Sequence, residues 1–209
     1  KMRAVCHVGI VVLLTVLAAG GGQMKVPQGC VAADGVGASY REYASRVIHR
    51  KTGIELLLVP AGPYTMGQDG WWGERQGTFA KPFYVAKTEV TNAQYKKFIA
   101  ATGYDGSQDV DATYDMYLLH LRGKSIMPTG DNFPVVYVSW RNAKAFCQWA
   151  GGLDLPTEAQ WEYACRAGSK TAFCFGDSAS ELGRYGNFAD RTLGTANPNF
   201  HWASKASDD

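Results

Sequence analysis

Residues 155–168, Leu-Pro-Thr-Glu-Ala-Gln-Trp-Glu-Tyr-Ala-Cys-Arg-Ala-Gly, carry the signals of one short helix at both ends. Thr157 can cap the N-terminus, and Gln160, three residues later, completes a capping box. Glu158 places negative charge at the positive end of the helix dipole, and Gly168 can adopt the left-handed conformation that ends a helix. Apolar residues at i, i+3, i+4 spacing predict one buried face, made of Trp161, Ala164 and Cys165.

This stretch closely resembles the signature of the formylglycine-generating enzyme family, also called the sulfatase-modifying factor family. The family usually has Arg-Leu-Pro-Thr-Glu-Ala-Glu-Trp-Glu-Tyr, whereas here Asp154 stands where Arg is expected and Gln160 replaces a Glu. Three further blocks resemble the family and occur in its order. They are V-P-A-G-P-Y-T-M-G at 59–67, K-T-E-V-T-N-A-Q-Y-K-K-F at 87–98, and P-V-V-Y-V-S-W-R-N-A-K-A-F-C-Q-W-A at 134–150.

Local patterns predict the remaining elements. Apolar runs stopped by Pro or Gly predict strands at 55–60, 64–67, 82–90 and 133–138. Two further capped helices are expected, one after Thr91 with Gln94 and one after Ser139, with a brief helix within 42–51. The residues expected to be buried in the two capped helices are Tyr95, Phe98, Ile99, Trp140, Ala143, Phe146, Cys147 and Ala150.

The composition is that of a globular protein with no nucleic-acid-binding character. The 209 residues are 46% hydrophobic and 19% charged, enough for one domain with a real core or a domain plus a leader. The formal charge is +2, and without Lys1 and Arg3 the basic and acidic residues are equal at 19 each. The sequence has no basic tract and no interleaving of basic and aromatic residues, which excludes the usual nucleic-acid signature.

The N-terminus has the three parts of a secretory signal. Lys1 and Arg3 form the positive start, residues 8–17 are apolar, and small residues around Ala19 suit cleavage. The apolar run is shorter than the roughly 20 residues of an ordinary membrane span. We therefore predict a signal peptide at 1–19, a linker at 20–51, the domain at 52–209, and export to the periplasm or the medium. A retained signal anchor is the alternative.

Five cysteines are present, and Cys6 lies in the predicted leader. The other four are Cys30, Cys147, Cys165 and Cys174. An exported protein could oxidise them, but none of their spacings is C-x-x-C or a zinc pattern. The alternative is that Cys147 and Cys165 are small buried hydrophobes.

The resemblance implies an α+β fold, an irregular C-type lectin-like domain with little regular secondary structure. The family's Gly-Leu-Tyr-Asp-Met-x-Gly-Asn-Val-Trp-Glu-Trp block does not occur here, so the resemblance covers roughly the first two thirds of the domain. In some members, cysteines at the positions of Cys147 and Cys165 form disulfides with cysteines late in the domain. A bridge between these two would need Cα atoms within about 7 Å, which the sequence leaves open.

The resemblance also implies the chemistry. In the family's enzymes two cysteine thiolates bind copper(I), and molecular oxygen oxidises a cysteine within a Cys-x-Pro-x-Arg segment of a sulfatase to formylglycine. None of the four cysteines outside the leader matches that pair, so the resemblance assigns no catalytic residue in this chain.

Structural calcium is a second implied ligand, since the family holds calcium through side-chain and backbone oxygens. The matching positions are Asn187 through its side chain, Phe188 through its carbonyl, and Asp209 (or Asp208) through its carboxylate. A polar surface loop is the alternative.

Two functions follow from the resemblance. The first is an exported factor that makes formylglycine in sulfatases. The second is a non-catalytic binding or scaffold module of the same fold, for which exposed Trp71 and Trp72 would supply a surface. The family's iron-dependent sulfoxide synthases are a more distant third, because the helical domain with a His-rich iron site that they carry has no counterpart in the sequence.

Overall fold

The computed structural model describes residues 12–15, 25–33, 39–40, 42–67, 73–107, 117–123 and 129–185. The chain divides into two compact units. We call residues 8–64 and 76–158 the sheet unit, and residues 1–7, 65–75 and 159–209 the α3 unit. The two are described separately below.

The described residues begin with the strands β1 to β9 and continue with helices, interrupted by the short strand β10, which confirms mixed α and β content. The strands are β1 (Leu13–Thr15), β2 (Cys30–Ala32), β3 (Ser39–Tyr40), β4 (Tyr43–Ala44), β5 (Arg46–His49), β6 (Glu55–Val59), β7 (Gly62–Met66), β8 (Arg75–Phe79), β9 (Phe83–Ala86) and β10 (Leu153–Asp154). The helices are α1 (Asn92–Thr102), α2 (Trp140–Ala150), α3 (Glu158–Arg166), the 3-10 turn Ala179–Glu181 and α4 (Leu182–Tyr185).

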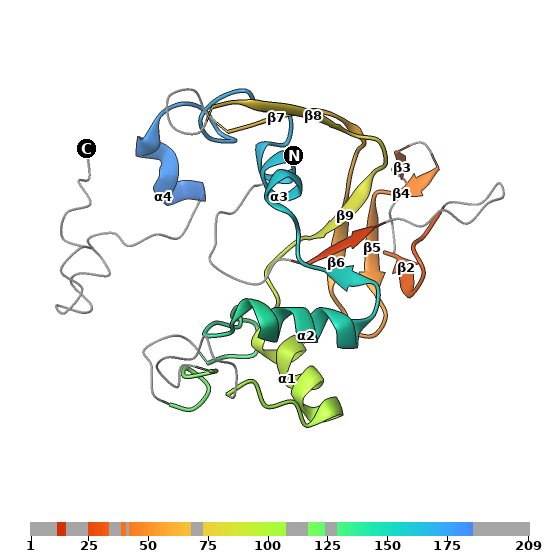
Figure 1. The fold of residues 1–209 in the computed structure, drawn as a ribbon, viewed down its shortest axis with the longest axis vertical. Helices are drawn as coiled ribbons and strands as arrows, with labels where there is room; N and C mark the ends of the chain where they lie inside the picture. The colour runs from red at the N-terminus through yellow and green to blue at the C-terminus, as the bar shows by residue number, and fades with distance from the viewer. Residues whose placement is uncertain are drawn as a thin grey trace. The chain divides into compact units, whose positions relative to one another are not determined.

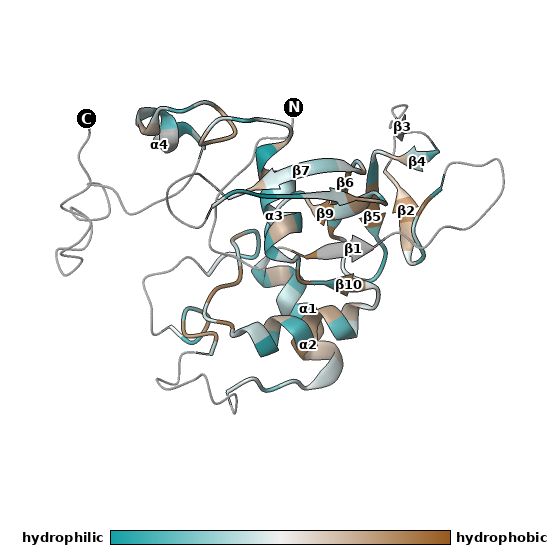
Figure 2. Cartoon of the chain, turned by 45° about the horizontal axis from the view of Figure 1, so that its top comes forward, coloured by the Kyte–Doolittle hydropathy of each residue, from teal (hydrophilic) through white to brown (hydrophobic). Residues whose placement is uncertain are grey.

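The sheet unit is built on a six-stranded antiparallel sheet with the order β10-β1-β9-β6-β5-β2. The strand β9 is buried at every position, as expected for a strand inside a sheet. Figure 2 shows hydrophobic residues gathered on β2, β5 and β6, whereas β7 is pale to hydrophilic. The core therefore lies against the six-stranded sheet.

The helices α1 and α2 lie side by side in the sheet unit (Figure 1) and contribute an aromatic cluster. The ring centroids of Tyr95 and Phe146 are 5.7 Å apart, and those of Phe98 and Phe146 are 5.9 Å apart in an edge-to-face arrangement. All three side chains are at most 2% exposed. Aromatic pairs at this spacing are favourable beyond the area they bury, so the cluster fixes the packing of the helix pair.

The three helices for which the sequence has capping signals are confirmed as α1, α2 and α3. Thr91 and Gln94 form the predicted capping box at the start of α1, and Gly103 closes the helix in a left-handed conformation with φ 66°. Ser139 caps α2, and Asn142 completes a capping box that the sequence analysis had not specified. The cap residues are adjacent to the backbone that they bind, which is why local sequence was sufficient here.

The structure differs from the sequence predictions at several places. The brief helix within 42–51 is instead β4 and β5, and 133–138 contributes only a bridge between Thr91 and Pro134. The predicted linker at 20–51 contains β2 and β5, so the sheet unit includes residues before 52. Trp140, which was predicted to be buried, is 65% exposed at the first position of α2, whereas Phe146 in the same helix is fully buried.

Within the segment predicted as the apolar core of a signal peptide, the described residues 13–15 form the strand β1. Residues 13–15 pair with β9 on one side and with β10 on the other. The described residues include no helix that is long and apolar enough to cross a bilayer. The leader and the site of its cleavage remain predictions.

Candidate functional site

The predicted calcium ligands lie outside the described residues. This holds for Asn187, Phe188 and Asp209, and also for Trp71 and Trp72 of the predicted binding surface. Within the described ranges, no group of three or more His, Cys, Asp or Glu side chains could hold a metal ion. The calcium site therefore remains a prediction.

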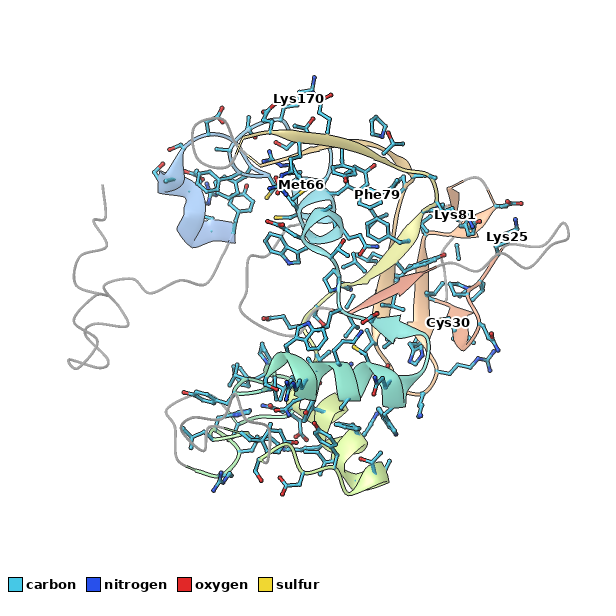
Figure 3. All side chains as sticks on the ribbon, viewed as in Figure 1. Lys25, Cys30, Met66, Phe79, Lys81 and Lys170 are labelled. Atoms are coloured by element: carbon cyan, nitrogen blue, oxygen red, sulfur yellow. The ribbon has the colours of Figure 1, made fainter. Side chains whose placement is uncertain are left out.

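Two of the cysteines are buried thiols of the sheet unit. Cys30 belongs to β2 (Figure 3) and is 6% exposed, and Cys147 belongs to α2 and is 1% exposed. Burial raises the pKa of the Cys30 thiol to about 11 and that of Cys147 to about 12, so both are protonated at neutral pH. Both thiols are enclosed in the core of the sheet unit, where a substrate polypeptide cannot reach them.

The other two cysteines belong to the α3 unit. Cys165 lies on α3 and Cys174 lies beyond it, and both are partly buried. None of Cys30, Cys147, Cys165 and Cys174 takes part in a disulfide. A bridge between Cys147 and Cys165, which the sequence left open, is therefore not formed. For Cys147 the structure supports the alternative of a small buried hydrophobe, whereas Cys165 is only partly buried.

The signature helix α3 is held by polar contacts instead of a buried face. None of its residues is fully buried, and Trp161 is 39% exposed, so the predicted burial of Trp161, Ala164 and Cys165 is wrong. Glu162 accepts a hydrogen bond from the Gly67 N–H at 2.9 Å, and Arg166 donates to the Gly67 carbonyl at 2.9 Å. These two contacts lie within the α3 unit and fix the turn after β7.

The charges of this contact neutralise one another. Nη2 of Arg166 lies 2.7 Å from Oε1 of Glu162, and Nη1 donates to the carbonyl of Thr171 at 3.2 Å. Both side chains are about four-fifths buried, with 23% and 20% exposure. Because the guanidinium is already bound on three sides, this pair is suited to holding backbone and not to binding an anionic substrate. We call Glu162, Arg166 and Gly67 the turn clamp.

Gly67 is required by this geometry. Its φ of 85° lies in the left-handed region, and a Cβ there would come within 2.5 Å of the Gly73 carbonyl oxygen. Gly67, from the block at 59–67, therefore acts together with Glu162 and Arg166 of the signature stretch. Sequence analysis missed this link, because the two blocks are about 95 residues apart along the chain.

Two buried histidines in the sheet unit were also missed. Nε2 of His49 donates to the Gly151 carbonyl at 3.1 Å, and Nδ1 accepts from the Thr52 hydroxyl at 3.0 Å. A carbonyl can only accept, which fixes the neutral tautomer with hydrogen on Nε2. Burial is the largest influence on the ring and lowers the pKa of His49. The neutral ring thus joins β5 to the residue that follows α2.

His120 forms a second buried contact, with Nε2 2.8 Å from the Asn92 side-chain oxygen. The Asn92 amide in turn donates to the Gly130 carbonyl at 3.0 Å. Burial lowers the pKa of His120, and its Nδ1 has no partner. Both histidines are at most 2% exposed, so neither can exchange protons with a substrate at the surface.

Asp154, which departs from the family signature, forms a local ion pair. Its carboxylate binds the Lys144 ammonium, and this hydrogen bond lowers the pKa of Asp154. The contact joins α2 to β10. The residue thus has a structural partner of its own in this chain.

Comparison with known proteins supports the family resemblance of the four sequence blocks. A family model described as "Sulfatase-modifying factor enzyme 1-like domain" matches residues 44–208. The formylglycine-generating enzyme of Mus musculus is 32% identical over 169 residues, covering 63% of this chain and 45% of that protein. The protein named "Inactive C-alpha-formylglycine-generating enzyme 2" of Bos taurus is 31% identical, covering 56% and 50%.

Among solved structures, PvdO from Pseudomonas aeruginosa is similar at 25% identity, with a TM-score of 0.48, covering 67% of this chain and 56% of that one. The chain spans about half the length of the two curated relatives. The family model covers most of the chain and includes all four sequence blocks. The chain therefore belongs to the sulfatase-modifying factor family.

Proposed function

We propose that the protein acts on a cysteine of a sulfatase polypeptide and that its reaction is the oxidation of that cysteine to formylglycine. The observation that carries the proposal is the family match over residues 44–208, together with the 32% identity to a formylglycine-generating enzyme. The substrate segment is of the type Cys-x-Pro-x-Arg. The domain is an α+β fold of the C-type lectin-like kind, acting after export.

The stoichiometry of the proposed reaction defines which co-substrates the protein needs. Converting the cysteine side chain to an aldehyde with molecular oxygen releases hydrogen sulfide and water and consumes a pair of electrons and two protons, so an external thiol is needed as reductant. Copper(I) would serve the oxygen chemistry, whereas Cys30 and Cys147 are enclosed in the core and out of reach of a substrate polypeptide. We therefore assign these two thiols to the core and not to the reaction.

A second candidate is a non-catalytic module of the same fold that binds the sulfatase segment without oxidising it. One observation favours it: a relative named as inactive is 31% identical to this chain. Binding and oxidation can be separated by experiment.

The test uses the native protein, purified from its source, with a synthetic Cys-x-Pro-x-Arg peptide, copper(I), molecular oxygen and a thiol. Mass spectrometry reads the peptide, and an aldehyde-reactive hydrazide confirms the product. Conversion supports the enzyme, and saturable binding of an unchanged peptide supports the module. A peptide in which Ser replaces the cysteine is the matched control.

The calcium site is part of the same proposal. Asn187, Phe188 and Asp209 would supply an amide oxygen, a carbonyl and a carboxylate, which are the ligand types that calcium prefers. We expect calcium to raise the melting temperature of the protein and EDTA to reverse the rise. An unchanged melting temperature over a calcium titration would argue against the site.

A further inference from the structure

The strand β1 occupies the slot between two strands that do not pair with each other. Leu13 lies opposite Val85 of β9 and opposite Asp154 of β10, and Leu14 lies opposite Tyr84 and Leu153. Since adjacent strands are about 4.8 Å apart, β9 and β10 are separated by about 10 Å. Without β1, backbone N–H and C=O groups on both sides of this slot would have no strand to pair with.

The slot is an interior position of the sheet. The four residues of β9 are at most 8% exposed, and Val12, directly before β1, is fully buried in the core cluster. The Ala86 N–H donates to the Val12 carbonyl at 3.0 Å, which extends the ladder by one residue. The segment is therefore bound through both its backbone and the Val12 side chain.

The occupant comes from a segment with the composition of a leader. Residues 8–17 are apolar, and the nearest described residue after β1 is Lys25. The connection between β1 and the rest of the sheet unit thus includes the predicted cleavage site near Ala19. Cleavage there would leave β1 held by hydrogen bonds and packing alone.

We propose that the slot between β9 and β10 is a strand-acceptor site, and that residues 12–15 are its occupant in this chain. The site binds an extended apolar segment by adding it to the sheet between two existing strands. Processing of the N-terminus then converts an internal strand into a separable peptide ligand. The inference is independent of the oxidation reaction proposed above.

The first test is a cross-link in the full chain. Bonded and non-bonded pairs alternate in an antiparallel ladder, so the Val12–Ala86 bond makes Leu13 and Val85 a non-bonded pair with Cα atoms about 4.5 Å apart. That separation suits a disulfide. The variant L13C/V85C is oxidised and mapped by mass spectrometry, and L14C/V85C is the control displaced by one residue.

We expect an intramolecular bridge between the two introduced thiols in the first variant and little or none in the control. Absence of this bridge would overturn the assignment of the occupant. A bridge that joins two molecules would also overturn it, because the slot would then be filled by a second copy.

The second test asks whether the site accepts the segment as a separate peptide. A protease recognition sequence replaces residues 20–24 of the full chain, and the folded protein is cut there. We expect the N-terminal fragment to co-elute with the rest of the protein and to be displaced by an excess of a peptide of residues 8–18 with added terminal lysines. Once the N-terminal fragment has been removed, the melting temperature of the remaining protein should rise with the concentration of the added peptide.

The control peptide carries the L14P change, which removes a backbone donor and should bind at least tenfold more weakly. Loss of the fragment on cutting, with an unchanged melting temperature, would contradict a strand-acceptor site. Equal binding of both peptides would contradict recognition through strand pairing. Neither readout depends on enzymatic activity.

Discussion

Glu162 and Arg166, one helical turn apart on α3, bind the two backbone groups of a single residue, Gly67. Glu162 accepts from its N–H and Arg166 donates to its carbonyl, each at 2.9 Å, while the two side chains form an ion pair of 2.7 Å. The signature stretch at 155–168, which contains both side chains, therefore holds the turn after β7 within the α3 unit. Both side chains position the backbone of Gly67.

The turn clamp predicts a large effect for a small change. In the variant E162A, the Gly67 N–H loses its acceptor and Arg166 loses its anion, so we expect the free energy of unfolding to fall by about 1–3 kcal/mol. Urea denaturation measures this. The matched control is E181A, which removes the exposed ion pair of Glu181 with Arg184 and should lower the stability clearly less than E162A. Equal effects of the two variants would show that the clamp contributes little.

Gly67 and Gly53 provide a second comparison. Both have left-handed φ angles, 85° and 76°, but only at Gly67 would a Cβ meet backbone, the Gly73 oxygen at 2.5 Å. The variant G53A should therefore cost about 1 kcal/mol through its φ angle alone. We expect G67A to cost at least about twice that, measured by thermal and urea unfolding. A G67A protein as stable as G53A would contradict the close approach to Gly73.

The buried histidines predict a loss of stability at acid pH. The pKa values of His49 and His120 are lowered in the folded protein by burial, and nearby Lys51 and Lys96 act in the same direction. Below about pH 6.5 the unfolded chain binds protons that the folded protein does not. The stability that the two neutral histidines contribute is therefore complete above that pH. It is lost as the pH falls toward their pKa values in the folded protein.

Unfolding measured between pH 7.5 and 5 checks this. Each histidine can contribute a slope of up to about 1.4 kcal/mol per pH unit, so H49Q and H120Q should each flatten the curve. A slope that neither variant changes would show that other groups bind the protons.

Thiol labelling distinguishes the cysteines. Cys30 and Cys147 are buried with pKa values raised to about 11 and 12, whereas Cys174 is only partly buried. Because the thiolate is the reactive form, we expect iodoacetamide at pH 8 to modify Cys174 at least tenfold faster than Cys30 or Cys147. Mass spectrometry of the digested protein gives each rate. Rapid labelling of Cys147 in the folded protein would contradict its assignment to the core.

Local signals were sufficient for the helices but not for the sheet. Thr91 and Ser139 bind backbone within three residues of themselves, so their sequences alone specify the two capped helix starts. The strand β9 pairs with β1 and β6, which lie far from it along the chain, and no local pattern encodes which strands will pair. For the same reason residues 42–51 were predicted as a helix when they are strands.

The candidate site was the least predictable part. The family could be recognised from ordered blocks, but Glu162, Arg166 and Gly67 come together only in three dimensions. The burial of Trp161 was overestimated, because apolar spacing reports a helix face and not whether anything covers it. The apolar run at 8–17 has the composition both of a leader and of an interior strand, and composition alone does not separate them.

The measurement that tests the central claim most directly is the fate of the cysteine in a Cys-x-Pro-x-Arg peptide incubated with the native protein, copper(I), molecular oxygen and a thiol. The account predicts an aldehyde at that position, formed with turnover and lost when copper is chelated. A peptide that binds the protein but keeps its thiol under these conditions would contradict it, and would establish the domain as a binding module of the same family.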